Sequence, residues 1–237
     1  MRTIALLPFL LALLPVVAQD DADAMLAGLQ ALRRDDHTRA EKAFTTAVER
    51  DPADEKAWYY RAVNRLAAGD APGAKRDLDH LIALDPAHAH AYLRRSEALA
   101  QLGDVRAAGS DLHTLLRHHP TGPAAEHALL QLGHFAMLRG EVAEALRQYD
   151  RLVAISPEHA MGRCNRGIAF AALGRDQEAR TDLEKTITLD ASLDQAHANL
   201  GIVLIRLGER ERACSAFAQA HALGDASVEE MLLIWCE

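Results

Sequence analysis

Five glycines recur along this chain at almost constant spacing. The intervals between Gly69, Gly103, Gly140, Gly174 and Gly208 are 34, 37, 34 and 34 residues. An alanine follows each glycine by five residues, and a large apolar residue follows that alanine by four. Counting back 34 residues finds an opening copy that contains Ala40 and Phe44. A fixed period of this length is typical of a chain built from stacked, similar units, and it predicts six of them.

Each unit has the pattern of two helices. Apolar residues recur at spacings of three and four, stop at the central glycine and then resume. Glycine ends the first helix because it adopts the left-handed conformation at no steric cost. The second helix ends where proline removes a backbone donor and clashes with the preceding turn. These prolines are Pro52, Pro86, Pro120 and Pro157.

Local signals refine the helix ends. Thr38 with Glu41, and Ser192 with Gln195, have the spacing of capping boxes, in which the first residue lies just before a helix. Thr121–Pro123 accounts for the one interval of 37 residues, and we interpret it as a three-residue insertion in a loop.

The repeat resembles that of the tetratricopeptide repeat family, in an exported bacterial form. The family's signature residues are matched here by Gly28, Trp58, Tyr92, Leu132, Gly133, Gly167, Phe170, Leu200 and Gly201, together with the alanines and prolines above. Arginines stand where the family has leucine, at Arg61, Arg95 and Arg166. The resemblance implies an all-α fold, an α-solenoid with a right-handed superhelix. Its six helix pairs would span about 21–54, 55–88, 89–122, 126–159, 160–193 and 194–225, within a domain of residues 19–237.

The first residues have the pattern of a secretory signal peptide. Arg2 supplies a positive charge, an apolar run follows to Val17, and small residues precede a polar break. We predict removal of residues 1–18, with cleavage after Ala18. The alternative is a membrane anchor, but the run is shorter than the roughly 20 residues that span a bilayer. The protein is therefore expected in the periplasm or outside the cell, without a membrane span.

The last residues predict one more helix, at 226–236. A solenoid needs such an element to cover its final apolar face, and Val228, Met231, Leu232 and Trp235 fall on one stripe. Cys214 lies 10 residues before Gly224 and Cys236 lies 12 after it, so a chain reversal would bring them together. In an oxidising compartment this predicts a disulfide, with two buried free thiols as the alternative. Cys164 is left over, either as an inert buried thiol or as a reactive one.

Motifs for catalysis or for cofactors are missing from the sequence. We find no GxSxG, HExxH, CxxC or phosphate-binding glycine loop. Of twelve histidines, only His90, His127 and His134 suggest a shared face, and we expect solvated or core histidines instead of a metal site. The net charge of −8 without a basic cluster argues against nucleic acid as a partner. We therefore expect no enzyme activity, no cofactor and no metal.

The resemblance implies that the first helices of successive pairs line a concave groove that binds an extended peptide or a helix of another protein. The groove residues would be Tyr59, Val63, His90, Leu93, Glu97, Leu130, His134, Met161, Ile168 and Ile202. The alternative is that many of them pack against the next pair. The predicted function is a protein-interaction scaffold, and the alternative function is a periplasmic chaperone or carrier for exported apolar segments. The sequence leaves the oligomeric state open.

Overall fold

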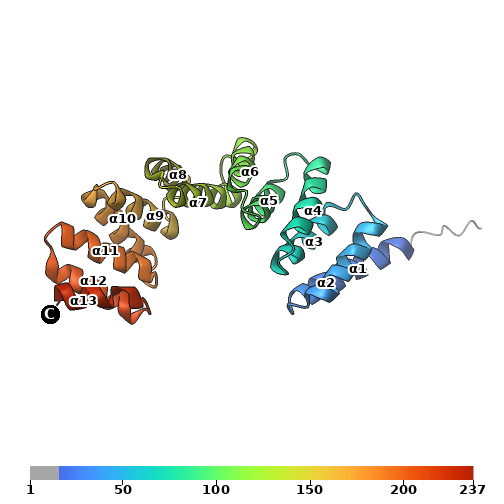
Figure 1. Cartoon of the computed structure of the whole chain (residues 1–237). Coiled ribbons are helices and arrows are strands. Elements are labelled where there is room, and N and C mark those ends of the chain that lie inside the picture. Colours follow the sequence, from blue (N-terminus) through green and yellow to red (C-terminus); the bar gives the residue numbers. More distant parts are fainter. Residues whose placement is uncertain (1–15, 237) are drawn as a thin grey trace, which may run out of the picture. The chain divides into compact units, whose positions relative to one another are not determined.

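The computed structural model describes residues 16–236, with the backbone alone described for residues 16–23. Thirteen α-helices, one short 3-10 helix and no strand occur in this described part of the chain (Figure 1). The protein is thus an all-α solenoid of consecutive helix pairs, as the sequence predicts. The described residues divide after Gly103 into two compact units, residues 16–103 and residues 104–236.

The first unit holds five helices, in which each helix packs against the next along the chain. They are α1 (Val16–Leu32), α2 (His37–Arg50), α3 (Glu55–Ala67), α4 (Ala71–Leu84) and α5 (Ala89–Gln101). The second unit has the same sequential packing. Its elements are α6 (Val105–His118), α7 (Pro123–Leu138), α8 (Val142–Ile155), α9 (Ala160–Ala172), α10 (Asp176–Leu189), α11 (Asp194–Arg206), α12 (Arg210–Ala222), η1 (Ala226–Val228) and α13 (Glu229–Cys236).

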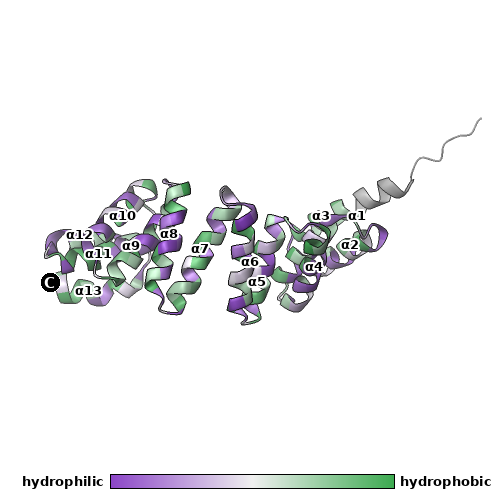
Figure 2. Cartoon of the chain, turned by 90° about the horizontal axis from the view of Figure 1, so that it is seen from above, coloured by the Kyte–Doolittle hydropathy of each residue, from purple (hydrophilic) through white to green (hydrophobic). Residues whose placement is uncertain are grey.

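Within each unit the core lies between neighbouring helices, and every helix also carries polar residues (Figure 2). In the second unit, one apolar cluster runs from Ala136 on α7 to Val228 in η1. Its two largest fully buried members, Tyr149 and Phe217, lie on second helices. The period of the sequence therefore sets the period of the core.

The helix ends confirm one expectation and overturn another. All five recurring glycines take positive φ values just after a first helix. The predicted capping boxes are wrong, because Asp36 caps α2 by accepting from the N–H of Arg39, and Ser192 instead donates to Asp190. The same aspartate cap recurs before α4 and α6. In these three helices, an aspartate directly after the turn accepts a hydrogen bond from one of the first free backbone N–H groups.

The irregular interval has a different structural cause from the one expected. The connection between α6 and α7 is residues 119–122, as long as the equivalent connection 156–159 between α8 and α9. Instead, α7 has 16 residues where α9 and α11 have 13. The three extra residues extend the helix at Pro123, whose fixed φ suits a first helical position. The insertion is therefore in a helix and not in a loop.

Residues 1–15 of the predicted signal peptide lie outside the described residues. The predicted cleavage point after Ala18 falls in the first turn of α1. Within residues 16–236, no helix is both long enough and apolar enough to cross a bilayer.

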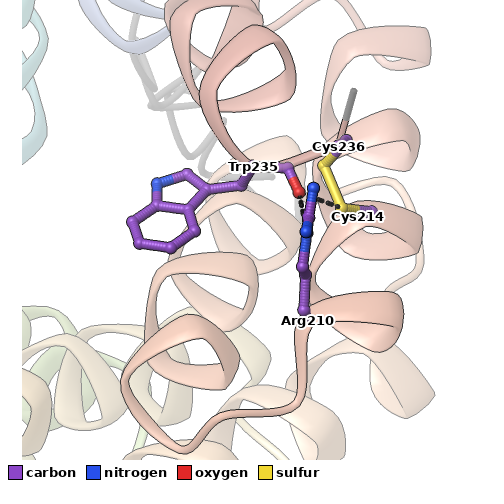
Figure 3. The surroundings of a disulfide bond; sticks show 4 residues. All are labelled: Arg210, Cys214, Trp235 and Cys236. Atoms are coloured by element: carbon purple, nitrogen blue, oxygen red, sulfur yellow. Dashed lines mark hydrogen bonds between the residues drawn. A yellow bond between two sulfur atoms is a disulfide. The ribbon is translucent and has the colours of Figure 1, made fainter.

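The final helix packs on α12 and is tied to it by a disulfide between Cys214 and Cys236, whose Cα atoms are 5.5 Å apart (Figure 3). Val228 is buried, and Met231 and Leu232 pack against the core, as expected. Trp235 is 40% exposed, so it does not join the predicted apolar stripe. Its ring points away from the disulfide in Figure 3, while its carbonyl accepts from Arg210.

Reduction of this disulfide is expected to loosen the C-terminal end first. The bond joins cysteines 22 residues apart, and closing a loop of that size contributes about 3 kcal/mol. Thermal unfolding followed by circular dichroism should therefore show a lower midpoint when a reductant is added. The Cys214→Ser/Cys236→Ser variant is the control, since its midpoint should be low and insensitive to reductant. An unchanged midpoint for the reduced native chain would contradict the expectation.

Candidate interaction surface

All ten residues predicted to contact a partner lie on first helices. We call these positions the first-helix surface. In the first unit they lie on α3 and α5, and they are Tyr59, Val63, His90, Leu93 and Glu97. In the second unit they lie on α7, α9 and α11, and they are Leu130, His134, Met161, Ile168 and Ile202.

In the second unit this surface leaves apolar side chains in contact with solvent. Met161 is 36% exposed and Ile202 is 41% exposed, while Leu130 and Ile168 are partly buried against the core. Leu130 and His134 are four residues apart and share a face of α7. Large apolar residues that are not covered by their own fold mark surfaces where another protein binds.

In the first unit the surface is more polar and one predicted member is absent from it. Leu93 is buried, so it contributes to packing and not to the surface. The rings of Tyr59 and His90 lie edge to face, with centroids 6.3 Å apart. His88 is 6.0 Å from Tyr59, and its Nδ1 accepts the N–H of Ala91 at the start of α5.

Arg94 joins this cluster although the sequence did not single it out. Its guanidinium donates to Glu97 at 2.8 Å and to Tyr59. Burial lowers the pKa of Arg94, but the hydrogen bonds to Tyr59 and Glu97 outweigh it and raise the pKa overall. The spacing of three between Arg94 and Glu97 on a predicted helix was the signal that would have found it.

Buried ion pairs hold the helices that present this surface. Arg61 donates two hydrogen bonds of 2.9 Å to Asp77, which joins α3 to α4. Arg65 also reaches Asp77, at 2.9 Å, and Glu41 on α2, at 2.6 Å. The Asp77 side chain is only 3% exposed. Its charge is therefore tolerated because two guanidinium groups neutralise it.

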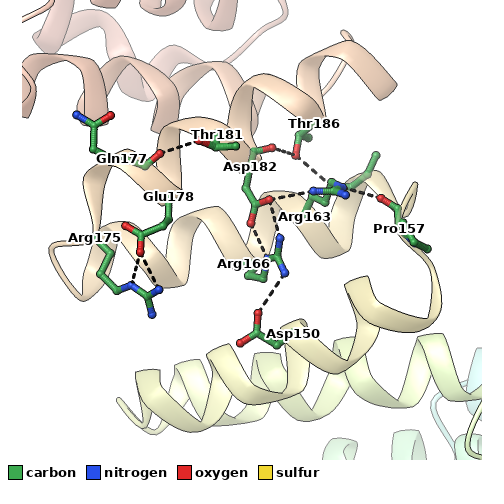
Figure 4. Close-up of polar contacts among 11 residues, drawn as sticks. Asp150, Pro157, Arg163, Arg166, Arg175, Gln177, Glu178, Thr181, Asp182 and Thr186 are labelled. Atoms are coloured by element: carbon green, nitrogen blue, oxygen red, sulfur yellow. Dashed lines mark hydrogen bonds and ion pairs between the residues drawn. The ribbon is translucent and has the colours of Figure 1, made fainter.

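The same arrangement recurs between α9 and α10 (Figure 4). Arg166 donates to both carboxylate oxygens of Asp182, at 2.6 and 2.8 Å, and Arg163 donates at 3.1 Å. These hydrogen bonds to Asp182 raise the pKa of Arg166. Two residues correspond to about 200° around a helix, so Ile168 points away from the side of α9 that the ion pair fixes. The buried ion pair thus fixes the direction in which the partly buried Ile168 points.

The described residues offer little for covalent or metal chemistry. Cys164 is 1% exposed, and burial raises the pKa of its thiol to about 11, so the nucleophilic thiolate is scarce at neutral pH. Between residues 16 and 236, no group of three histidine, cysteine, aspartate or glutamate side chains is arranged to hold a metal ion.

A sequence model of the tetratricopeptide repeat matches residues 25–74, 61–123, 97–160 and 130–194. Taken together, the matched residues cover most of the chain.

Parts of two longer curated proteins are similar in sequence to this chain. TPR repeat-containing thioredoxin TTL4 of Arabidopsis thaliana is 38% identical over 99 residues, which are 40% of this chain and 14% of that protein. DnaJ homolog subfamily C member 3 of Mus musculus is 26% identical over 231 residues, which are 89% of this chain and 46% of that protein. The chain thus spans less than half the length of each relative.

Solved structures of low sequence identity share the fold. PilF of Pseudomonas aeruginosa has a TM-score of 0.78 at 15% identity, and the match covers 94% of this chain and 100% of PilF. PilW, described as a type IV pilus biogenesis factor, has a TM-score of 0.73 at 18% identity, covering 90% and 99%. YrrB, described as having an unusual peptide-binding site, has a TM-score of 0.64 at 20% identity, covering 80% and 96%.

Loss of one buried carboxylate should destabilise the second unit far more than loss of an exposed one. Asp182→Asn leaves Arg163 and Arg166 partly buried with a weaker partner, at an expected cost of about 3 kcal/mol. Glu178→Gln is the matched control in the same helix, because its pair with Arg175 is about half exposed and screened by solvent, so its loss should change the stability far less. Urea unfolding measures both, and equal shifts in the two midpoints would refute the role given to Asp182.

Proposed function

Because the chain belongs to the tetratricopeptide repeat family, we propose that it is a non-enzymatic scaffold that binds a peptide or a helix of a partner protein on its first-helix surface. The observation that carries this proposal is the row of apolar side chains on α7, α9 and α11, which the solenoid itself leaves partly uncovered. An apolar centre with a few polar neighbours is the usual composition of a protein interface.

Amide side chains supply the polar part of this surface. Gln131, Asn165 and Asn199 occupy the same position on three successive first helices, and all three are half-buried. An amide both donates and accepts, so it can pair with the main chain of an extended peptide whatever its sequence. This arrangement supports recognition of a peptide backbone, with the apolar residues selecting its side chains. The description of YrrB as peptide-binding is consistent with such a role.

We place this activity outside the cytoplasm, in the periplasm or beyond it. The apolar N-terminal run with its charged start supports export. The disulfide between Cys214 and Cys236 supports it independently, because such bonds persist in oxidising compartments.

A second candidate function, as a carrier of exported apolar segments, is favoured by the capping helix. Leu233 and Ile234 on α13 are 61% and 58% exposed, beside Trp235. A carrier would suppress aggregation of unrelated unfolded proteins, whereas a scaffold would form a complex of fixed stoichiometry with one partner. Light scattering of a denatured client with and without the chain distinguishes the two.

Ile168→Asp should weaken partner capture by at least about tenfold, because it places a charge at the centre of an apolar contact. Affinity purification from an envelope fraction, followed by quantitative mass spectrometry, measures the bound partner. Leu84→Asp is the matched control, since Leu84 is 41% exposed on a second helix and should leave capture unchanged. Equal circular dichroism spectra establish that both variants fold. Undiminished capture by Ile168→Asp would exclude the first-helix surface.

A further inference from the structure

A cavity of about 790 Å³ lies in the second unit, away from the first-helix surface. It is lined by α6, by the second half of α7 and by residues of α8 and its preceding turn. Leu132 and Phe135 on α7 and Arg139 directly after it line the cavity. At 100° per residue, these three positions point about 140° to 200° away from Leu130 and about 100° to 160° away from His134, which places them on the other side of the helix. The cavity and the first-helix surface are therefore two separate places.

One feature of the sequence opens this cavity, which lies at the junction between the third and fourth pairs. Gly109 stands where the other pairs have a side chain, and an added Cβ would meet only Leu132, at 3.8 Å. The residues at the equivalent position are Glu41, Lys75, Leu146, Arg180 and Cys214. The cavity is thus a specific feature of this pair and not of the repeat.

The lining is strongly basic in a protein that is acidic overall. Most arginines of the second unit pair with a carboxylate, as Arg139 does with Glu141 at 2.7 Å. By contrast, Arg106, Arg117 and Arg151 have no carboxylate partner among the residues that the structure describes, and all three line the cavity. Arg117 and Arg151 donate only to neutral side chains, Thr114 and Gln148.

We propose that this cavity binds an acidic segment of a partner protein. Guanidinium groups without carboxylate partners match the carboxylates of Asp and Glu, with which they form paired, charge-assisted hydrogen bonds. Leu116, Leu132 and Phe135 give the same cavity an apolar wall for the aliphatic part of such side chains. The volume lies in the range of sites for ligands of many atoms, which a single small anion would not fill.

This second site gives the scaffold a different kind of contact from the first-helix surface. One contact buries apolar side chains, and the other neutralises charge. Because they lie on opposite sides of α7, one partner would not obstruct the other. The inference does not depend on the first-helix surface being correct, since its residues and its ligand chemistry are distinct.

The test uses the full chain and a fluorescein-labelled peptide of alternating Glu and Ala, with fluorescence anisotropy as the readout. A peptide with Gln in place of Glu is the uncharged control. We expect saturable binding of the acidic peptide alone, weakened by added salt. Arg117→Gln and Arg151→Gln should each raise the Kd roughly tenfold, because each removes a charge-assisted contact. Arg76→Gln, an exposed arginine of α4, is the matched control and should leave the Kd unchanged.

A second variant tests the cavity without changing any charge. Gly109→Leu inserts the side chain that the fourth pair carries at this position, and it should abolish binding while the helix content stays native. The proposal is overturned if the acidic peptide does not bind, if the Gln peptide binds equally, or if Arg76→Gln weakens binding as much as Arg117→Gln. Displacement of the peptide by equimolar inorganic phosphate would also overturn it, since that result indicates a small-anion site.

Discussion

The structure depends on one close contact inside its helix pairs, between a small residue on the first helix and a large side chain on the second. A Cβ atom added to Gly133 would lie 2.2 Å from the ring of Tyr149, and one added to Gly201 would lie 2.4 Å from Phe217. The aromatic ring therefore occupies the space that a side chain would fill, and the two helices approach closely. The second pair has Ala62 at the glycine position and Leu78 at the aromatic position, and both belong to one core cluster. Here the residue on the first helix is larger than glycine, and the residue on the second helix is smaller than an aromatic one. Between these pairs, side-chain size is exchanged across the contact while the helices stay close-packed. The fifth pair departs from this exchange, since it combines Gly167 with Leu183.

The first-helix residue directly before this small residue is also matched to a residue of the second helix, but by charge and not by size. Where the first helix has Arg61 or Arg166, the second has Asp77 or Asp182, sixteen residues later. Where the first helix has Leu132, the second has the neutral Gln148. A buried carboxylate is costly without its partner, so arginine and aspartate have to occur together. These pairs fix the rotation of α3 and α9, and with it the direction in which the partner-facing residues of those helices point.

Much of this fold could be predicted from the sequence because the repeat is a local, periodic signal. The glycine turns, the capping helix and the joining of Cys214 to Cys236 all follow from spacing along the chain. The predictions that failed were those for features that depend on contacts between helices. The insertion at Pro123 lengthens a helix because the loop keeps its standard length, and Leu93 is buried although its position suggested the surface. The basic cavity was missed because its arginines are far apart in sequence and gather only once α6, α7 and α8 have packed.

The most direct test of this account is a double-mutant cycle at the contact between Gly133 and Tyr149. Gly133→Ala should lower the stability of the native chain by about 2 kcal/mol through overpacking. In a Tyr149→Leu background the same change recreates the alanine–leucine pair of the second repeat, and it should be neutral or stabilising, since alanine favours helix over glycine. Urea unfolding of the four proteins gives the coupling. If Gly133→Ala costs the same in both backgrounds, the two residues are not complementary and the account is wrong.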